Sequence, residues 1–281
     1  MTKLKNMQEV IENNSTSLDI GKIKEYAKCK WMAKEVVFFE EIGSTNVEAA
    51  KLAAWGGKHG TLVLADRQTG GKGRRGRSWL TPGNTSIAVS FLLKPQLEAE
   101  YASMLTLVQA MAVADTLEEV CCCKAQIKWP NDILINEKKV CGILTEMNLA
   151  GSDIASIIIG TGINVNQESF PEEIADIATS LKKELRMEQC REKLISVLCC
   201  KFEYYYEQFM TTKDLSYIMK EYNARLISAG RSVRVLDPKE EFVGEALGIN
   251  DVGELLVKKE DGNVVNVYAG EVSVRGIYGY V

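Results

Sequence analysis

The chain has 281 residues, of which 46% are hydrophobic and 26% are charged, the balance of an ordinary globular protein with room for one sizeable domain and a small one. Its 34 basic and 38 acidic side chains leave a net charge of −4, which disfavours bulk binding of nucleic acid. No stretch approaches the roughly 20 apolar residues of a membrane span. The first residues also lack the apolar core of a signal peptide.

The eight cysteines and the single histidine exclude several kinds of site. No Cys-x-x-Cys pair and no Cys/His cluster occurs, so we expect neither zinc nor a disulfide framework, and we infer a reducing, cytoplasmic compartment. The histidine, His59, stands in Gly-Gly-Lys-His-Gly and is expected in an exposed turn. Ser-His-Asp or Cys-His chemistry would depend on this one residue and is therefore disfavoured.

The hydrophobic pattern predicts an irregular succession of helices and strands over most of the chain. A short helix or ordered linker is expected at 18–30, and a helix at 47–55 whose start carries Thr45 and Glu48 in the spacing of a capping box. Longer helices are expected at 101–120, 190–210 and 213–227. Strands are expected at 36–42, 61–65, 85–93, 125–129, 133–135, 140–147 and 154–159, with a hairpin around residue 136.

The composition changes after residue 230. Short β runs separated by Gly, Asp and Asn predict a small β-barrel, with strands at 232–236, 241–246, 255–258, 264–268 and 271–277. The preceding elements lack regular βαβ alternation, which argues against a Rossmann fold. We therefore expect an α+β fold, with a mixed β-sheet and flanking helices before this point and a small β-barrel after it.

The strongest local signal is the loop from Gly70 to Arg77, which contains four glycines and four cations. The loop has no apolar side chain to bury and its charges repel each other, so we expect it to be mobile without a ligand. Phosphate oxygens could accept hydrogen bonds from its arginines and from its backbone N–H groups. A solvated basic loop or a weak nucleic-acid patch would fit the same residues, whereas a P-loop or a dinucleotide-binding fingerprint does not.

Three further stretches place polar side chains or glycines beside apolar strands. In Lys-Trp-Pro-Asn-Asp at 128–132, the amide and carboxylate suit Mg²⁺ beside a polyphosphate, although an Asx turn alone would also explain them. Lys139 either enters the site with the apolar strand at 140–144 or lies in solvent at the end of that strand. Gly-Thr-Gly-Ile-Asn at 160–164 either lets a ligand approach closely or forms a bulge or tight turn.

Together, and in this order, these stretches resemble the biotin protein ligase family. The resemblance extends from about Glu40 to Ile277 and comprises Ser-Thr-Asn at 44–46, Gln68, Gly-Lys-Gly-Arg-Arg-Gly-Arg at 71–77 with Trp79, Lys-Trp-Pro-Asn-Asp at 128–132, Lys-Val-Cys-Gly-Ile-Leu at 139–144, Gly-Thr-Gly-Ile-Asn-Val-Asn at 160–166 and the C-terminal β module. It implies an N-terminal segment or linker at 1–34. A catalytic domain of the class II aminoacyl-tRNA synthetase-like, biotin–lipoate ligase fold would follow at 35–229, and an SH3-like β-barrel at 230–281.

The resemblance also implies an activity. Such a ligase joins biotin to ATP with Mg²⁺, forming biotinyl-5′-adenylate and releasing pyrophosphate. It then transfers biotin to a lysine of a biotin carboxyl carrier protein domain, that of acetyl-CoA carboxylase or a similar enzyme. The reacting carboxylate and α-phosphate are both negative, so the site needs positive charge and no histidine. Several relatives form homodimers through the sheet edge, and a homodimer is left open for this chain.

The resemblance assigns expected roles to individual positions. Catalysis is expected to depend on Arg74, Lys128, Asp132 and Lys139, of which Asp132 is the Mg²⁺ ligand. Biotin is expected to contact Ser44, Thr45, Asn46 and Gln68 in a pocket shaped by Gly142, Gly160 and Gly162. The nucleotide and the adenylate are expected to contact Gly71, Lys72, Gly73, Arg74, Arg75, Arg77, Trp79, Lys128, Asn131, Lys139 and Asn164. Trp79 is expected to stack on adenine. The family often has arginine at the position of Lys72, and lysine cannot form the planar two-point contact of arginine.

Three other functions share part of this pattern. Lipoate protein ligases have the same fold and chemistry, but Gly-Arg-Arg-Gly-Arg and Lys-Trp-Pro-Asn-Asp favour biotin. A biotin-responsive regulator needs an N-terminal winged helix, for which too few residues precede Ser44, so we expect a ligase that does not bind DNA specifically. An RNA-binding protein that uses Arg74, Arg75 and Arg77 should have aromatic stacking platforms and a basic surface, which an acidic chain with one basic loop does not suggest.

Overall fold

The larger sheet of this computed structural model contains strands β1 (Val36–Ile42), β2 (Thr61–Gln68), β3 (Ser86–Leu93), β4 (Gln126–Lys128), β5 (Asp132–Ile135), β6 (Lys138–Ala150) and β7 (Asp153–Asn164). The structure describes residues 17–237, 240–270, 272–276 and 280. The strand order is β1-β2-β3-β7-β6-β5-β4. The pair β1–β2 is parallel and the other neighbouring pairs of this sheet are antiparallel. A parallel pair needs a crossover connection, which is supplied here by a helix.

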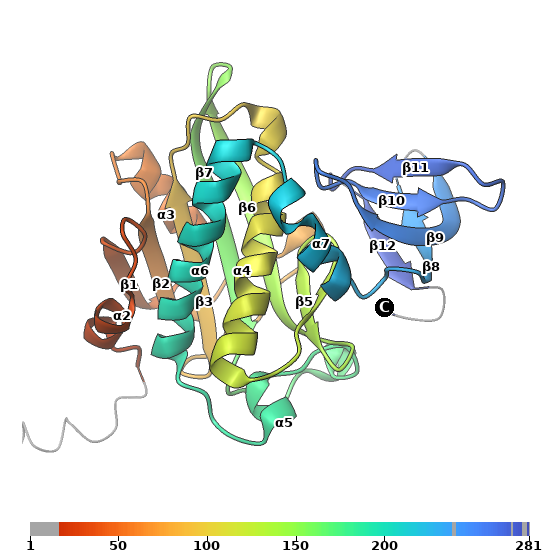
Figure 1. Cartoon of the computed structure of the whole chain (residues 1–281). Helices are drawn as coiled ribbons and strands as arrows, with labels where there is room; N and C mark the ends of the chain where they lie inside the picture. Colours follow the sequence, from red (N-terminus) through yellow and green to blue (C-terminus); the bar gives the residue numbers. More distant parts are fainter. Residues whose placement is uncertain (1–16, 238–239, 271, 277–279, 281) are drawn as a thin grey trace, which may run out of the picture.

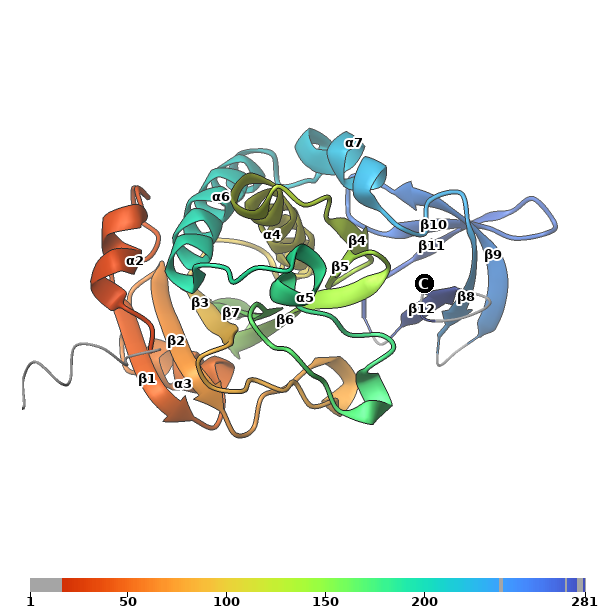
Figure 2. The ribbon, with the colours of Figure 1, turned by 90° about the horizontal axis from the view of Figure 1, so that it is seen from below.

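Helices cover both faces of this sheet (Figures 1 and 2). The α-helices of the described residues are α2 (Ile20–Tyr26), α3 (Thr45–Ala54), α4 (Met104–Cys121), α5 (Leu181–Leu185), α6 (Arg191–Thr212) and α7 (Ser216–Arg225). Helices α4 and α6 pack together on one face over the main core, and the crossover helix α3 covers the other face above a smaller core. Because both faces are covered, every residue of β3 is buried. Within the described residues, no helix combines the length and apolar composition that a membrane span requires.

A second, antiparallel sheet follows helix α7. It contains β8 (Ser232–Leu236), β9 (Glu241–Ile249), β10 (Leu255–Lys258), β11 (Val264–Val267) and β12 (Ser273–Gly276), in the order β11-β10-β9-β8-β12. Several contacts attach it to the larger part. Among them, the indole N–H of Trp129 donates to the Gly253 carbonyl oxygen at 3.0 Å, and Asn223 on α7 pairs with the backbone of Ile249. We call this sheet with its loops the C-terminal module.

The α+β fold predicted from the sequence is confirmed, and so is the hairpin, which is formed by β5 and β6. The short helix α5 was not expected. Glu271 and Ile277, the expected ends of the last strand, lie outside the described residues, as do residues 1–16 of the expected N-terminal segment.

Two predictions about the site elements are corrected. The capping box is absent because Ser44, not Thr45, is the N-cap of α3, while the backbone N–H and hydroxyl of Thr45 both bond to Gln68 Oε1. The residues from Gly160 to Asn164 do not turn but continue β7, paired with strands on both sides.

His59 is half-buried rather than exposed. Its ring lies 4.7 Å from that of Trp31 and 5.5 Å from that of Tyr206, and its Nδ1 accepts a hydrogen bond from the backbone N–H of Lys94. Burial lowers the pKa of His59 below its ordinary value. The neutral ring therefore packs as an aromatic group.

Candidate active site

Small residues form a lane across three neighbouring strands of the larger sheet. Ala88 on β3 pairs with Gly162 on β7, and Gly162 pairs with Gly142 on β6. The indole of Trp79 lies on this lane, because a methyl group added at Gly162 would overlap it and one added at Gly142 would come within 3.0 Å of it. Glycine in a strand commonly marks a close approach of another group. Here it lets an aromatic ring lie directly on the sheet.

A small cavity of about 50 Å³ opens above this lane. Parallel pairing brings the carboxyl ends of β1 and β2 together, with Ile42 opposite Gln68, and only two residues separate the end of β1 from the start of α3. The predicted biotin contacts thereby meet in one place. The cavity is lined by Ser44, Thr45, Asn46, Gln68, Lys72, Gly73, Arg74, Trp79, Ala88, Asn131, Lys139, Gly142, Ile143, Leu144, Gly160, Thr161 and Gly162.

Polar side chains of this small cavity are held in fixed positions. Gln68 Oε1 accepts from the backbone N–H of Thr45 at 2.8 Å and from its hydroxyl at 3.1 Å, and Gln68 Nε2 donates to Thr81 Oγ1 at 3.0 Å. The amide of Asn46 lies against Gly160, where any added methyl group would overlap it. Glycine at position 160 therefore makes room for Asn46 rather than directly for a ligand.

A larger cavity of about 920 Å³ adjoins the small one, and its charge is strongly positive. Its one carboxylate among the described lining residues is Asp132. Its cations are Arg67, Arg74, Arg75, Arg77, Lys128, Lys139 and Arg275. Such a lining suits a polyanion, because opposite charges attract strongly where water is partly excluded.

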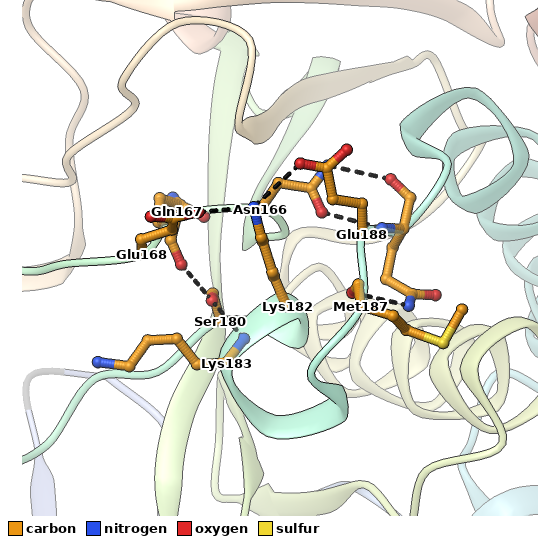
Figure 3. Close-up of polar contacts among 9 residues, drawn as sticks. Asn166, Gln167, Glu168, Ser180, Lys182, Lys183, Met187 and Glu188 are labelled. Carbon is orange, nitrogen blue, oxygen red and sulfur yellow. Dashed lines mark hydrogen bonds and ion pairs between the residues drawn. The ribbon is translucent and has the colours of Figure 1, made fainter.

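One wall of the larger cavity was not anticipated from the sequence. Its apolar part comes from the segment between β7 and α6 and includes Phe170, Pro171, Ile174 and Ile177. Side chains hold the base of this segment (Figure 3): Asn166 pairs with both backbone groups of Gln189, and Lys182 forms ion pairs with Glu168 and Glu188. No motif marks this wall, because its residues converge only through these tertiary contacts.

Asp132 is the centre of a charged cluster on the larger cavity. Its Oδ1 forms an ion pair with Lys139 Nζ at 2.6 Å, and its Oδ2 accepts a hydrogen bond from the hydroxyl of Tyr280 at 2.6 Å. The ammonium of Lys128 lies 3.3 Å from the centre of the Tyr280 ring and also donates to its carbonyl oxygen. Burial lowers the pKa of Lys128 to about 8, against the opposing effect of Asp132.

Arg74 connects the glycine-rich loop to two distant segments. Its guanidinium donates to Asn131 Oδ1 at 2.9 Å and to the carbonyl oxygens of Ala269 at 3.0 Å and Gly270 at 2.7 Å. The loop therefore has a defined contact with the C-terminal module. Its predicted mobility without a ligand stays a prediction.

Most of the predicted site residues line one of the two cavities. Lys128, Asp132, Arg77 and Asn164 line the larger one, and Trp79 and Lys139 line both. Gly71 lines neither; its carbonyl oxygen accepts the N–H of Trp79, and a methyl group at Gly71 would overlap the Trp79 carbonyl. The indole Nε1 of Trp79 is buried without a hydrogen-bond partner among the described residues.

Sequence reasoning missed three polar residues at the site. They are Ser90 and Glu146, which bond to Asn46, and Tyr280, which bonds to Asp132. Ser90 resembles any small residue of a buried strand, and Tyr280 lies far along the chain from Asp132. Only strand pairing and domain packing bring them to the site.

Comparison with known proteins matches both parts of the chain to known families. Residues 38–164 match the biotin/lipoate A/B protein ligase family, and residues 229–275 match the biotin protein ligase C-terminal domain. A bifunctional ligase/repressor BirA of Bacillus spizizenii is 37% identical over 249 residues, which cover 88% of this chain and 76% of the relative. A biotin–[acetyl-CoA-carboxylase] ligase of Paracoccus denitrificans is 33% identical, covering 83% of this chain and 98% of the relative.

A solved structure supports the same assignment. The biotin protein ligase from Aquifex aeolicus, solved in complex with biotin and ATP, is similar with a TM-score of 0.76 and 31% identity. The match covers 86% of this chain and 99% of that protein. Both the catalytic sheet and the C-terminal module are therefore shared, and the chain belongs to the biotin protein ligase family.

Proposed function

We propose that this chain activates biotin with ATP and transfers the biotinyl group to a lysine of a biotin carboxyl carrier protein domain, such as that of acetyl-CoA carboxylase. The observation that carries the proposal is the junction of the two cavities. The residues common to both linings are Gln68, Gly73, Arg74, Trp79, Asn131 and Lys139. A small cavity with amide and hydroxyl side chains meets a large, strongly basic one there, as the union of a headgroup with a nucleotide requires.

The two substrates are assigned to the cavities by their chemistry. The smaller cavity, over the glycine lane, receives the bicyclic headgroup of biotin. The larger, cationic cavity receives ATP, with its base against the apolar wall that includes Phe170 and its phosphates near Lys128. The carboxylate of biotin then reaches the junction at Lys139, whose ammonium offsets the repulsion between carboxylate and α-phosphate.

In the first step, a carboxylate oxygen of biotin attacks the α-phosphorus of ATP, and pyrophosphate leaves with the electron pair of the broken P–O bond. In the second step, the ε-amine of the acceptor lysine attacks the anhydride carbonyl carbon; AMP leaves and the amine loses a proton to solvent. Lys128, Lys139 and Arg74 supply the positive charge for these steps, which is the main requirement of phosphoryl and acyl-phosphate chemistry.

Mg²⁺ fits the residues of the larger cavity as an ion shared with the substrate. The described residues contain no cluster of three or more His, Cys, Asp or Glu that could hold a metal ion alone. Asp132 and Asn131 offer a carboxylate and an amide oxygen, and Mg²⁺ is commonly bound by one or two carboxylates together with phosphate oxygens. When bound, the ion would neutralise phosphate charge.

The comparisons support this proposal through the names of the relatives. The Aquifex protein was solved with biotin and ATP, and the relatives of Paracoccus denitrificans and Mycobacterium tuberculosis are named biotin–[acetyl-CoA-carboxylase] ligases. The absence of specific DNA binding and the cytoplasmic location stay predictions, and a homodimer stays open.

The test is ATP–pyrophosphate exchange with purified protein, with and without biotin and Mg²⁺. Exchange is expected only when both are present, and Lys139→Ala should lower it strongly while Lys138→Ala, its exposed neighbour, should not. Transfer is then measured by streptavidin detection of a carrier domain, with lipoate as competitor. Exchange that does not require biotin, or that lipoate supports equally, would contradict the proposal.

A further inference from the structure

The amide of Asn46 is held in one orientation from both ends. Its Nδ2 donates to the Glu146 carboxylate at 2.6 Å and to the Leu144 carbonyl oxygen at 3.3 Å. A carbonyl and an ionised carboxylate only accept, so a flipped amide would place its oxygen against two acceptors. At the other end, Asn46 Oδ1 accepts from the buried hydroxyl of Ser90 at 2.6 Å. Both ends therefore fix the same orientation.

This orientation determines what Asn46 can offer a ligand. Both hydrogens of its Nδ2 are already donated, so toward the smaller cavity the side chain can act only as an acceptor, through the remaining lone pair of Oδ1. Gln68 has the opposite character. Its Oε1 accepts two hydrogen bonds from Thr45 and its Nε2 gives one hydrogen to Thr81, which leaves one N–H to donate.

We infer that Ser90 and Glu146 are positioning residues that fix Asn46 as an acceptor beside the Gln68 donor, and thereby select a cyclic urea as the ligand headgroup. A cyclic urea carries the matching N–H and carbonyl groups. A 1,2-dithiolane ring carries neither and would leave the remaining N–H of Gln68 and the remaining lone pair of Asn46 Oδ1 without partners, which a site built for hydrogen bonds disfavours. The inference rests on the proposed function, in which the smaller cavity receives the headgroup of biotin.

The test compares three variants with two matched controls. Ser90→Ala and Glu146→Ala remove one support each, and Glu146→Gln retains a side-chain oxygen that can accept from Asn46. Ser86→Ala removes another fully buried hydroxyl from the same strand, outside both cavities. Thr145→Val alters the residue next to Glu146. The hydroxyl of Thr145 bonds to that of Thr106 on α4.

Binding is measured by calorimetry without ATP, using biotin and two analogues that each carry a methyl group on one ureido nitrogen. Wild type should prefer biotin to at least one methylated analogue. Ser90→Ala and Glu146→Ala should weaken biotin binding by about tenfold or more, the effect of losing a well-placed hydrogen bond, and should reduce that preference. Glu146→Gln and both controls should stay within about threefold of wild type, and the KM for ATP in pyrophosphate exchange should not change.

Two results would overturn the inference. One is wild-type binding of biotin by Ser90→Ala and Glu146→Ala. The other is an equal loss for biotin and both analogues, which indicates a structural role. A wild-type protein that binds biotin with this preference but catalyses no exchange would instead contradict the proposed function and leave the positioning role intact.

Discussion

Lys128 carries its charge in a partly buried position on the larger cavity, and this has a consequence for pH. Burial lowers its pKa to about 8, so the side chain is cationic below that pH and loses its charge as the pH rises through it. Phosphate binding needs the charged form. We therefore expect kcat/KM for ATP to be flat near neutral pH and to fall above pH 8.

The measurement is a pH profile of pyrophosphate exchange for wild type and Lys128→Arg. Arginine stays charged throughout this range, so the variant should lose the fall near pH 8 even if its maximum rate is lower. A profile with the same fall in both proteins would show that another group titrates.

Arg74 is expected to retain the biotinyl-adenylate. Its guanidinium already donates to Asn131 and to the backbone of the C-terminal module, which places it at the junction of the two cavities. Loss of a charge-assisted hydrogen bond costs roughly 1.5–3 kcal/mol, about ten- to a hundredfold in retention. Arg74→Gly should therefore release the intermediate and biotinylate serum albumin in solution, as detected with streptavidin. If Arg74→Gly is active on its acceptor but labels albumin no more than the wild-type protein does, Arg74 does not retain the intermediate.

At the scale of elements, the lane of small residues depends on three strands keeping their register. Gly162→Ala should force the Trp79 indole away from β7, because the added methyl group would overlap it. Overpacking of this kind costs about 1–3 kcal/mol. We expect the KM for biotin to rise by about tenfold or more, with a small fall in thermal stability.

Gly83→Ala is the matched control, since a methyl group there meets only Arg67 Cβ at 3.8 Å. Equal biotin KM values in Gly162→Ala and Gly83→Ala would contradict the importance of the lane.

Elements with a strong hydrophobic period were predictable from the sequence, and the site was predictable in part. The apolar stretches that form α4 and β3 can be recognised without knowledge of their distant partners. The basic loop and Lys-Trp-Pro-Asn-Asp can be recognised from their composition. The continuation of β7 through Gly160 was not predictable, because glycines usually interrupt strands and the pairing of Gly162 with Ala88 joins distant segments. The roles of three further residues were missed because their partners lie in distant segments of the chain. These residues are Ser90, Glu146 and Tyr280.

At the scale of the whole molecule, the two sheets meet at the larger cavity, to which side chains of both contribute. Tyr280 donates its hydroxyl to Asp132 and places its ring against Lys128, so it engages the groups proposed for phosphate and Mg²⁺. A nucleotide that binds at Asp132 must displace the Tyr280 hydroxyl from this carboxylate. Tyr280→Phe removes it and should lower the KM for ATP about fivefold, the effect of roughly 1 kcal/mol.

Tyr268→Phe is the control, because Tyr268 belongs to the same module and is exposed. Steady-state kinetics with varied ATP at saturating biotin measures the effect. A higher KM for ATP in Tyr280→Phe would mean that the hydroxyl assists nucleotide binding instead of competing with it.

The unpaired indole N–H of Trp79 should make the intrinsic fluorescence of the protein sensitive to ligand binding. Of the four tryptophans, Trp31 and Trp129 donate to protein oxygens and Trp55 is 78% exposed. Trp79 lines the cavity junction, and its Nε1 is buried without an acceptor among the described residues. A ligand oxygen that reaches Nε1 would stabilise the polar excited state of the indole. Titration with biotin and ATP should therefore shift the fluorescence emission to longer wavelength, and Trp79→Phe should abolish the shift while Trp55→Phe retains it.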